Sequence, residues 1–195
     1  MELDIYDFDK TVIPFDSGRK FFSYCLLHYP KTLIFLPWVL VGCILFALRI
    51  IDFAALKTIF FSFVRVIPLR KAVDGFWAAN RSTVREWAKP ENRERYSVVI
   101  SASPDFLIEG IIAELGFDSL ICTVHDRRTG ALLGSNCKGE EKIKRFRTQY
   151  PDAQVICVYS DSYRHDKPIF SLGKSCIHIE ANGKTVPFEF RKIYS

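Results

Sequence analysis

The sequence lacks the residue patterns that mark several common kinds of site. Its six cysteines form no CxxC pair, and its four histidines show no metal-ligand spacing. These absences exclude a disulfide framework and a zinc site, and they predict reduced, mostly buried cysteines in a cytoplasmic protein. The chain also has no internal repeat, no low-complexity segment and no recognition helix or stacking motif for nucleic acid. We therefore expect no nucleic-acid partner.

Charge is absent from residues 32–48, a run bounded by Lys31 and Arg49. A surface helix of a soluble protein shows a polar stripe, and this run has none. A membrane-spanning helix needs about 20 apolar residues, and Pro37 and Gly42 interrupt this shorter run, so we reject a full crossing. A signal peptide is excluded as well, because a strand-like acidic segment precedes the run.

Three arrangements of this run remain open. It is buried in the core of the surrounding segment, or covered by a partner subunit in an oligomer, or it lies as a helix or re-entrant hairpin in one leaflet of a bilayer. Residues 13–90 contain eleven Lys and Arg but only four Asp and Glu, a net charge of +7 in a chain of net charge +5. Basic residues among phenylalanines suit an anionic headgroup plane, so the charge favours peripheral binding to the cytoplasmic face of the membrane.

Two carboxylates, Asp7 and Asp9, lie one residue apart where a short apolar strand ends in a turn. Strand side chains alternate faces, so both acids can act on one group only if the strand breaks there. Neighbouring carboxylates repel unless a cation or proton lies between them. A hard cation such as Mg²⁺ resolves this conflict and leaves one oxygen free to attack phosphorus. The pattern indicates a phosphoryl-transfer site, and the alternative is an edge strand with solvated acids.

Two further apolar runs end in polar residues. One leads into Ser101, and the other leads into Asp161, with Asp166 five positions later. Such runs suit strands of a parallel sheet that is covered on both faces. Because open parallel sheets bind ligands at the carboxyl ends of their strands, we expect these residues to lie near Asp7. Further strands are predicted at 120–124 and 131–133, as a hairpin, and at 175–179 and 185–190.

Two lysines lie near the start of a helix predicted between these runs. Glu140 and Glu141 form an acidic first turn, which is a helix-start signal. Lys138 and Lys142 are four positions apart, so they share a face only if the helix already includes Lys138.

Taken in order, these segments resemble the motifs of the haloacid dehalogenase-like hydrolases, in the branch that includes phosphoserine phosphatase and phosphatidylglycerophosphatase C. The resemblance covers the whole chain. It implies an α/β fold with a Rossmann-like parallel sheet core, residues 1–12 and 91–195. It also implies an inserted α-helical cap, residues 13–90, which contains the apolar segment 32–48.

The resemblance implies roles for the four acids. Asp7 would be the nucleophile that forms an aspartyl phosphate, and Asp9 would be the general acid and base. Mg²⁺ would be bound by Asp7, by the backbone carbonyl of Asp9 and by Asp161, with Asp166 as a further ligand or orienting group.

The resemblance also implies phosphate-binding residues. Ser101 would bind the phosphoryl group together with one of the two lysines. The sequence around Lys138 is similar to that of phosphoserine phosphatases, whereas other members of the branch carry the lysine after Gly-Glu-Glu, which slightly favours Lys142. Ser160 departs from the family pattern, because a glycine is usual before the acid of this motif.

The resulting prediction is a Mg²⁺-dependent phosphomonoesterase. A lipid phosphate monoester such as phosphatidylglycerophosphate is the leading substrate, because the cap offers an apolar surface for acyl chains. Two alternatives remain: a soluble phosphatase for phosphoserine or another small metabolite, and a non-catalytic, membrane-associated interaction protein with the same fold.

Overall fold

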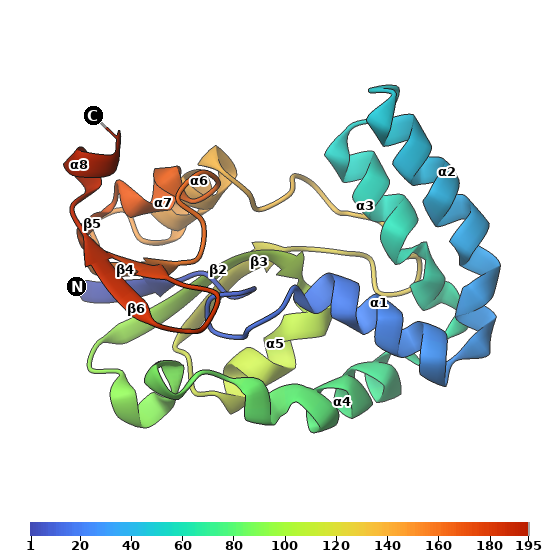
Figure 1. Cartoon of the computed structure of the whole chain (residues 1–195), viewed down its shortest axis with the longest axis horizontal. Coiled ribbons are helices and arrows are strands. Elements are labelled where there is room, and N and C mark those ends of the chain that lie inside the picture. Colours follow the sequence, from blue (N-terminus) through green and yellow to red (C-terminus); the bar gives the residue numbers. More distant parts are fainter. Residues whose placement is uncertain (195) are drawn as a thin grey trace.

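The computed structural model describes residues 1–194, which form a six-stranded sheet with helices on both faces (Figure 1). The strand order is β3-β2-β1-β4-β5-β6, in which neighbours are parallel except for the antiparallel pair β5 and β6. The α/β, Rossmann-like fold is therefore confirmed. The strands are β1 (Glu2–Tyr6), β2 (Tyr96–Pro104), β3 (Ser119–Thr123), β4 (Gln154–Ser160), β5 (Gly173–Ile179) and β6 (Thr185–Phe188).

The central strand β1 is buried on both faces. Leu3 and Ile5 pack into one hydrophobic cluster and Tyr6 into another, as expected for a strand covered on two sides. Asp4 interrupts the apolar run, and its carboxylate accepts a hydrogen bond from the Cys157 amide (2.9 Å) and pairs with Arg95. These partners offset the cost of burying the charge.

Helices enclose the sheet from two sides (Figure 1). Phe146 and Ile169 pack on one face, and Leu107 packs on the other, where the Trp77 indole donates a hydrogen bond to its carbonyl. The helices outside the insertion are α5 (Asp105–Glu114), α6 (Glu140–Gln149), α7 (Lys167–Phe170) and α8 (Phe190–Tyr194).

The segment between β1 and β2 is helical. Phe21, Phe63 and Phe76 of this segment share one buried cluster with Phe106 of α5, so part of the insertion continues the core of the sheet. Its α-helices are α1 (Ser17–His28), α2 (Leu36–Ala47), α3 (Phe53–Phe61) and α4 (Leu69–Asn80), joined by 3₁₀ turns at Pro30–Phe35, Ser62–Val66, Arg81–Thr83, Glu86–Ala88 and Pro90–Asn92.

The predicted hairpin after β3 forms in part. Residues 119–123 pair in parallel with β2, and the returning chain lies antiparallel to the residues just after β3, with a bridge between His125 and Leu132. The Leu133 amide donates to the Val124 carbonyl (2.9 Å), and the Asp126 side chain accepts hydrogen bonds from the Arg128 and Thr129 amides, which closes the turn. Residues 131–133 do not form a strand of the sheet.

Residues 30–61, which we call the apolar hairpin, project away from the sheet (Figure 1). Helices α2 and α3 pack closely at Gly42, where an added Cβ would lie 2.9 Å from Ile59. By length and composition, Pro30–Ala47 is the one segment of residues 1–194 able to cross a membrane.

Most of the apolar hairpin is exposed. Of the sixteen exposed large apolar side chains in residues 1–194, eleven belong to it, and Thr32 and Gly42 are the buried residues of Pro30–Ala47. The interpretation of residues 32–48 as a buried cap core is therefore wrong, because the insertion does not surround them. The exposed side chains are Leu33, Ile34, Leu36, Trp38, Leu40, Val41, Ile44, Phe46, Leu48, Ile50 and Phe53.

Candidate active site

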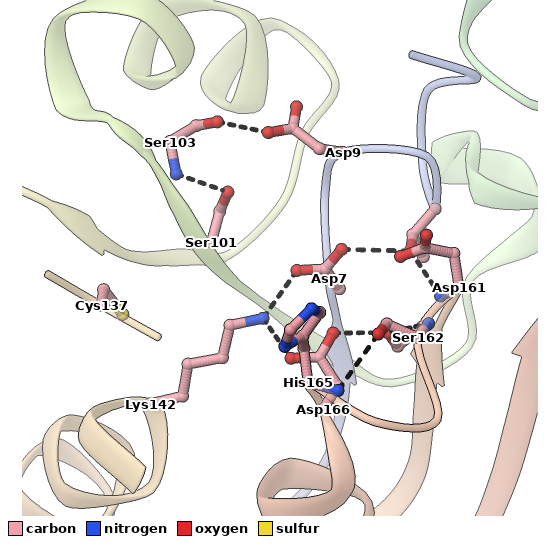
Figure 2. Close-up of polar contacts among 12 residues, drawn as sticks. Asp7, Asp9, Ser101, Ser103, Cys137, Lys142, Asp161, Ser162, His165 and Asp166 are labelled. Atoms are coloured by element: carbon pink, nitrogen blue, oxygen red, sulfur yellow. Dashed lines mark hydrogen bonds and ion pairs between the residues drawn. The ribbon is translucent and has the colours of Figure 1, made fainter. Parts of the chain in front are cut away.

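The loop after β1 separates the two acids of the first motif. The amides of Thr11, Val12 and Ile13 all donate to the Phe8 carbonyl, which curls the chain as soon as the strand ends. Asp7 consequently lies beside β4 and α6, whereas Asp9 lies beside β2 and α1 (Figure 2). The two carboxylates therefore belong to two different groups of side chains.

Three carboxylates gather at the carboxyl ends of β1 and β4. One oxygen each from Asp7, Asp161 and Asp166 lies within 4.8 Å of the others. The Lys142 ammonium donates to Asp7 and to Asp166, at 2.7 Å in each case (Figure 2). The structure thus brings four of the predicted site residues into one largely buried cluster.

Hydroxyl groups hold these acids in place. Thr11 donates from its hydroxyl to Asp7 (3.2 Å) and accepts the amide of Asp161 (3.0 Å), so it ties the first motif to the last. Ser160 donates to Asp166 and accepts the amide of Ser162. The serine that departs from the family pattern therefore orients an acid of the cluster.

The two candidate lysines separate at the start of α6. Gly139 has φ +60°, a conformation that glycine adopts without strain, and the helix begins only at Glu140. Lys142 lies within the helix, is 3% exposed and reaches the cluster. Lys138 lies outside the helix and is exposed, with its ammonium 5.4 Å from the centre of the Phe53 ring. The structure does not bring Lys138 to the acids.

The electrostatics of the cluster show how strongly its charges interact. Burial raises the pKa of Asp7, Lys142 opposes this rise, and the Asp166 carboxylate adds to it. Burial alone would lower the pKa of Lys142, but Asp7 and Asp166 outweigh it and hold the pKa above its ordinary value. Burial also raises the pKa of Asp161. With all four groups charged, three carboxylates and one ammonium leave a net charge of −2.

These residues fit a magnesium ion. Hard oxygen donors are the ligands that Mg²⁺ prefers, and one divalent charge would balance the excess of two negative charges. The same cation would oppose the rise in the pKa of Asp7 and keep it ionised. Asp7, Asp161 and Asp166 are the side chains that would hold the ion.

Asp9 lies in a second polar group with residues of β2 and α1. Its carboxylate accepts the Ser17 amide (2.9 Å) and the Ser103 hydroxyl. Figure 2 shows the second of these contacts. Burial raises the pKa of Asp9 to about 6, against the effect of these hydrogen bonds. Ser101 is buried, and its oxygen accepts the Ser103 amide (3.0 Å), which leaves the hydroxyl proton of Ser101 free for a ligand.

Sequence reasoning missed several polar residues of this region. Thr11, Ser17 and Ser103 contact the motif acids, and Lys57 of α3 donates to the Ala102 carbonyl between Ser101 and Ser103. Ser103 follows Ser101 by two positions and so lies near the same strand end, a signal that was present in the sequence. No comparable signal marks Lys57, which reaches the site only through the packing of α3.

The comparison with known families identifies the class of this protein. Residues 5–171 match the haloacid dehalogenase-like hydrolases. The match covers most of the chain, which therefore belongs to this family. The predicted family is confirmed, and with it the prediction of an enzyme of the hydrolase class.

Relatives of known sequence are similar over a short region. Protein CicA from two strains of Caulobacter vibrioides, NA1000 / CB15N and ATCC 19089 / CIP 103742 / CB 15, is 35% identical over 71 residues. This region spans 33% of the present chain and 32% of CicA.

Solved structures share the fold. A protein of unknown function from Bordetella pertussis Tohama I has a TM-score of 0.73 at 18% identity, covering 91% of this chain and 89% of its own. A phosphoserine phosphohydrolase-like protein from Francisella tularensis has a TM-score of 0.59 at 16% identity, covering 91% and 87%. A phospho-aspartyl intermediate analogue of phosphoserine phosphatase has a TM-score of 0.53 at 18% identity, covering 90% and 85%.

Proposed function

We propose that this protein is a Mg²⁺-dependent phosphatase that cleaves phosphate monoesters through an aspartyl phosphate on Asp7. The observation that carries the proposal is the cluster of three carboxylates with Lys142 at the carboxyl ends of β1 and β4. Phosphoryl transfer depends on in-line positioning and on neutralising the charge of the phosphoryl oxygens, and this cluster supplies groups for both.

The first step is the transfer of the phosphoryl group to the protein. A carboxylate oxygen of Asp7 attacks phosphorus, and the bond between phosphorus and the ester oxygen breaks. Asp9 gives its proton to the departing oxygen. The Ser101 hydroxyl and the Lys142 ammonium hold the phosphoryl oxygens. A magnesium ion held by Asp7, Asp161 and Asp166 would add positive charge beside these oxygens.

The second step is hydrolysis of the aspartyl phosphate. Asp9, now ionised, takes a proton from a water molecule, and the oxygen of that water attacks phosphorus. Inorganic phosphate leaves, Asp7 is regenerated as a carboxylate, and Asp9 again carries a proton. The pKa of Asp9, raised to about 6 by burial, suits a group that must donate a proton and accept one near neutral pH.

We further propose that the substrate is a lipid phosphate monoester at a membrane surface. The apolar hairpin supports this because its large apolar side chains are exposed together, which monomeric soluble proteins rarely show. The net charge of +7 in residues 13–90 suits an anionic bilayer. A hairpin that enters one leaflet would hold the strand ends near the headgroups.

A soluble phosphate monoester is the second candidate. The fold likeness to phosphoserine phosphatases favours it. On this alternative, the apolar hairpin would be covered by another subunit rather than by lipid.

The test is phosphate release from two sets of substrates, with and without Mg²⁺. One set contains phosphatidylglycerophosphate and phosphatidic acid in vesicles, and the other contains phosphoserine and sugar phosphates. Asp7→Asn keeps the size of the side chain but removes the attacking oxygen, and we expect it to lower release at least about a thousandfold. Chelation of Mg²⁺ should stop the wild-type reaction.

Each outcome decides one part of the proposal. Preference for the vesicle substrates supports the lipid assignment, and preference for the soluble esters contradicts it. Equal, negligible release by wild type and Asp7→Asn across both sets would contradict the phosphatase itself. Circular dichroism spectra of the two proteins control for folding.

A further inference from the structure

Two serines from distant parts of the chain fix the carboxylate of Asp9. The amide of Ser17, the first residue of α1, donates to one oxygen at 2.9 Å, and the hydroxyl of Ser103, near the end of β2, donates to the other. The two serine hydroxyls also contact each other, with 2.9 Å between their oxygens. Both carboxylate oxygens of Asp9 are therefore held. Figure 2 shows the contact with Ser103.

The direction of these hydrogen bonds follows from the number of protons. A serine hydroxyl has one proton, and that of Ser103 goes to Asp9. While Asp9 is ionised, Ser17 is therefore the donor in the contact between the serines, and Ser103 is the acceptor. Both serines are buried, at 0% and 5% exposure, so water does not compete for these bonds.

This arrangement fixes the plane of the carboxyl group and leaves lone pairs of its oxygens available for proton transfer. Each carboxylate oxygen has two lone pairs, and the donors found here occupy one on each oxygen. The remaining lone pairs are free to carry the proton that Asp9 must transfer. A general acid is effective only when its proton lies within hydrogen-bond reach of the leaving oxygen.

We propose that Ser103 and Ser17 are positioning residues that aim Asp9 at the leaving-group oxygen of the substrate. This inference rests on the proposed function, because it takes Asp9 as the general acid. In the step concerned, the bond between phosphorus and oxygen breaks while the proton moves from Asp9 to that oxygen. Loss of this orientation of Asp9 therefore slows only the cleavage of esters whose leaving oxygen needs the proton.

Two soluble esters distinguish this role from a structural one. The alkoxide that leaves from β-glycerol phosphate needs a proton, whereas p-nitrophenolate is stable without one. We expect Ser103→Ala to slow the single-turnover release of glycerol about tenfold to a hundredfold. Release of p-nitrophenolate, measured with enzyme in excess over p-nitrophenyl phosphate, should stay within about twofold of the wild type.

Further variants complete the test. Ser17→Ala keeps the amide donor, so it should slow glycerol release less than Ser103→Ala does and should also leave p-nitrophenolate release unchanged. It replaces Ser103→Ala in the test if that variant does not fold. Ser103→Thr keeps the hydroxyl and should restore glycerol release. Ser97→Ala is the matched control, because it removes another buried hydroxyl from β2, bonded to Asp118 away from the site. It should leave the ratio of the two rates unchanged.

The outcomes separate this inference from the proposed function. Equal slowing of both esters by Ser103→Ala, or no slowing of either by Ser103→Ala and Ser17→Ala, would overturn the positioning role while the phosphatase stands. Negligible release by wild type from both soluble esters and from the vesicle substrates, or equal release by wild type and Asp7→Asn, would overturn the phosphatase.

Discussion

The acid cluster and the apolar hairpin depart in opposite ways from the usual distribution of side chains. The cluster contains two buried carboxylates, one half-buried carboxylate and a buried ammonium, and the hairpin exposes eleven large apolar side chains. Buried charges cost free energy unless they are paired, and exposed apolar patches of this kind mark interaction surfaces. The partners that we propose for the two regions differ accordingly: a cation and a phosphate for the acid cluster, and a lipid surface for the apolar hairpin.

The largest effect should come from removing the one cation of the cluster. Lys142→Met leaves Asp7 and Asp166 without their ammonium partner, which should lower the free energy of unfolding by about 3–5 kcal/mol. Added Mg²⁺ should restore part of this loss, because a divalent cation takes over the charge balance. Urea unfolding with and without Mg²⁺ measures both effects.

Lys138→Met is the matched control for this prediction. Lys138 lies four residues earlier and is exposed, so its loss should change the free energy of unfolding by less than about 0.5 kcal/mol. Similar losses in the two variants would contradict the view that the ammonium of Lys142 balances the cluster.

The next largest effect should come from the apolar hairpin. Trp38 and Leu40 are 65% and 62% exposed, so Trp38→Glu with Leu40→Glu should leave the folded state intact. Because burial of each such side chain in lipid contributes about 1.5–3 kcal/mol, flotation with anionic vesicles should weaken at least about tenfold. Hydrolysis of p-nitrophenyl phosphate should not change.

Ile193→Glu controls for the introduction of charge at an exposed apolar site, since Ile193 is 48% exposed on α8, far from the apolar hairpin (Figure 1). The wild-type protein could instead fail to float and form assemblies in sedimentation that dissociate in the double variant. This result would show that a partner subunit, not a membrane, covers the apolar hairpin.

The smallest effect should come from Lys57, a residue of the apolar hairpin that contacts the end of β2. Its buried ammonium donates to the Ala102 carbonyl and to Asn136, and burial lowers its pKa from 10.5 to about 8. Between these values the unfolded chain binds a proton that the folded protein has released. Stability should therefore rise with pH in this window, by up to about 1.4 kcal/mol per pH unit.

Lys57→Met should not show this rise, whereas Lys144→Met, which removes an exposed lysine of α6, should show it unchanged. Urea unfolding of the three proteins at several values of pH between about 8 and 10.5 makes the comparison. A wild-type profile parallel to that of Lys57→Met would show that Lys57 does not titrate in this window.

Much of the sheet was predictable because its strands carry a strong local signal. The runs around Ile5, Ile100 and Val158 are apolar, and each is followed by polar residues at the strand end, where the site lies. The turn after β3 was predicted correctly, but residues 131–133 form one antiparallel bridge, at Leu132, and no strand of the sheet. The preference of a short segment for strand structure does not show which other segment it will pair with.

The site was predictable in its acids but not in the contacts that orient them. The choice between Lys138 and Lys142 depends on where α6 begins, and Gly139 decides this through its positive φ. Ser17 and Ser103 are 86 positions apart, so their contact is a consequence of tertiary packing. Motif spacing predicts which acids lie at the candidate site, whereas the hydroxyls that contact these acids depend on the fold.

The position of β1 in the sheet also constrains how the protein is made. β1 pairs with β2 and β4, so its second neighbour, Gln154–Ser160, is synthesised long after the apolar hairpin. Pairings between segments far apart in sequence form slowly, and the apolar surface stays unprotected meanwhile. During translation the apolar hairpin therefore leaves the ribosome before β4 can pair with β1, and its apolar side chains are exposed before the candidate active site has formed.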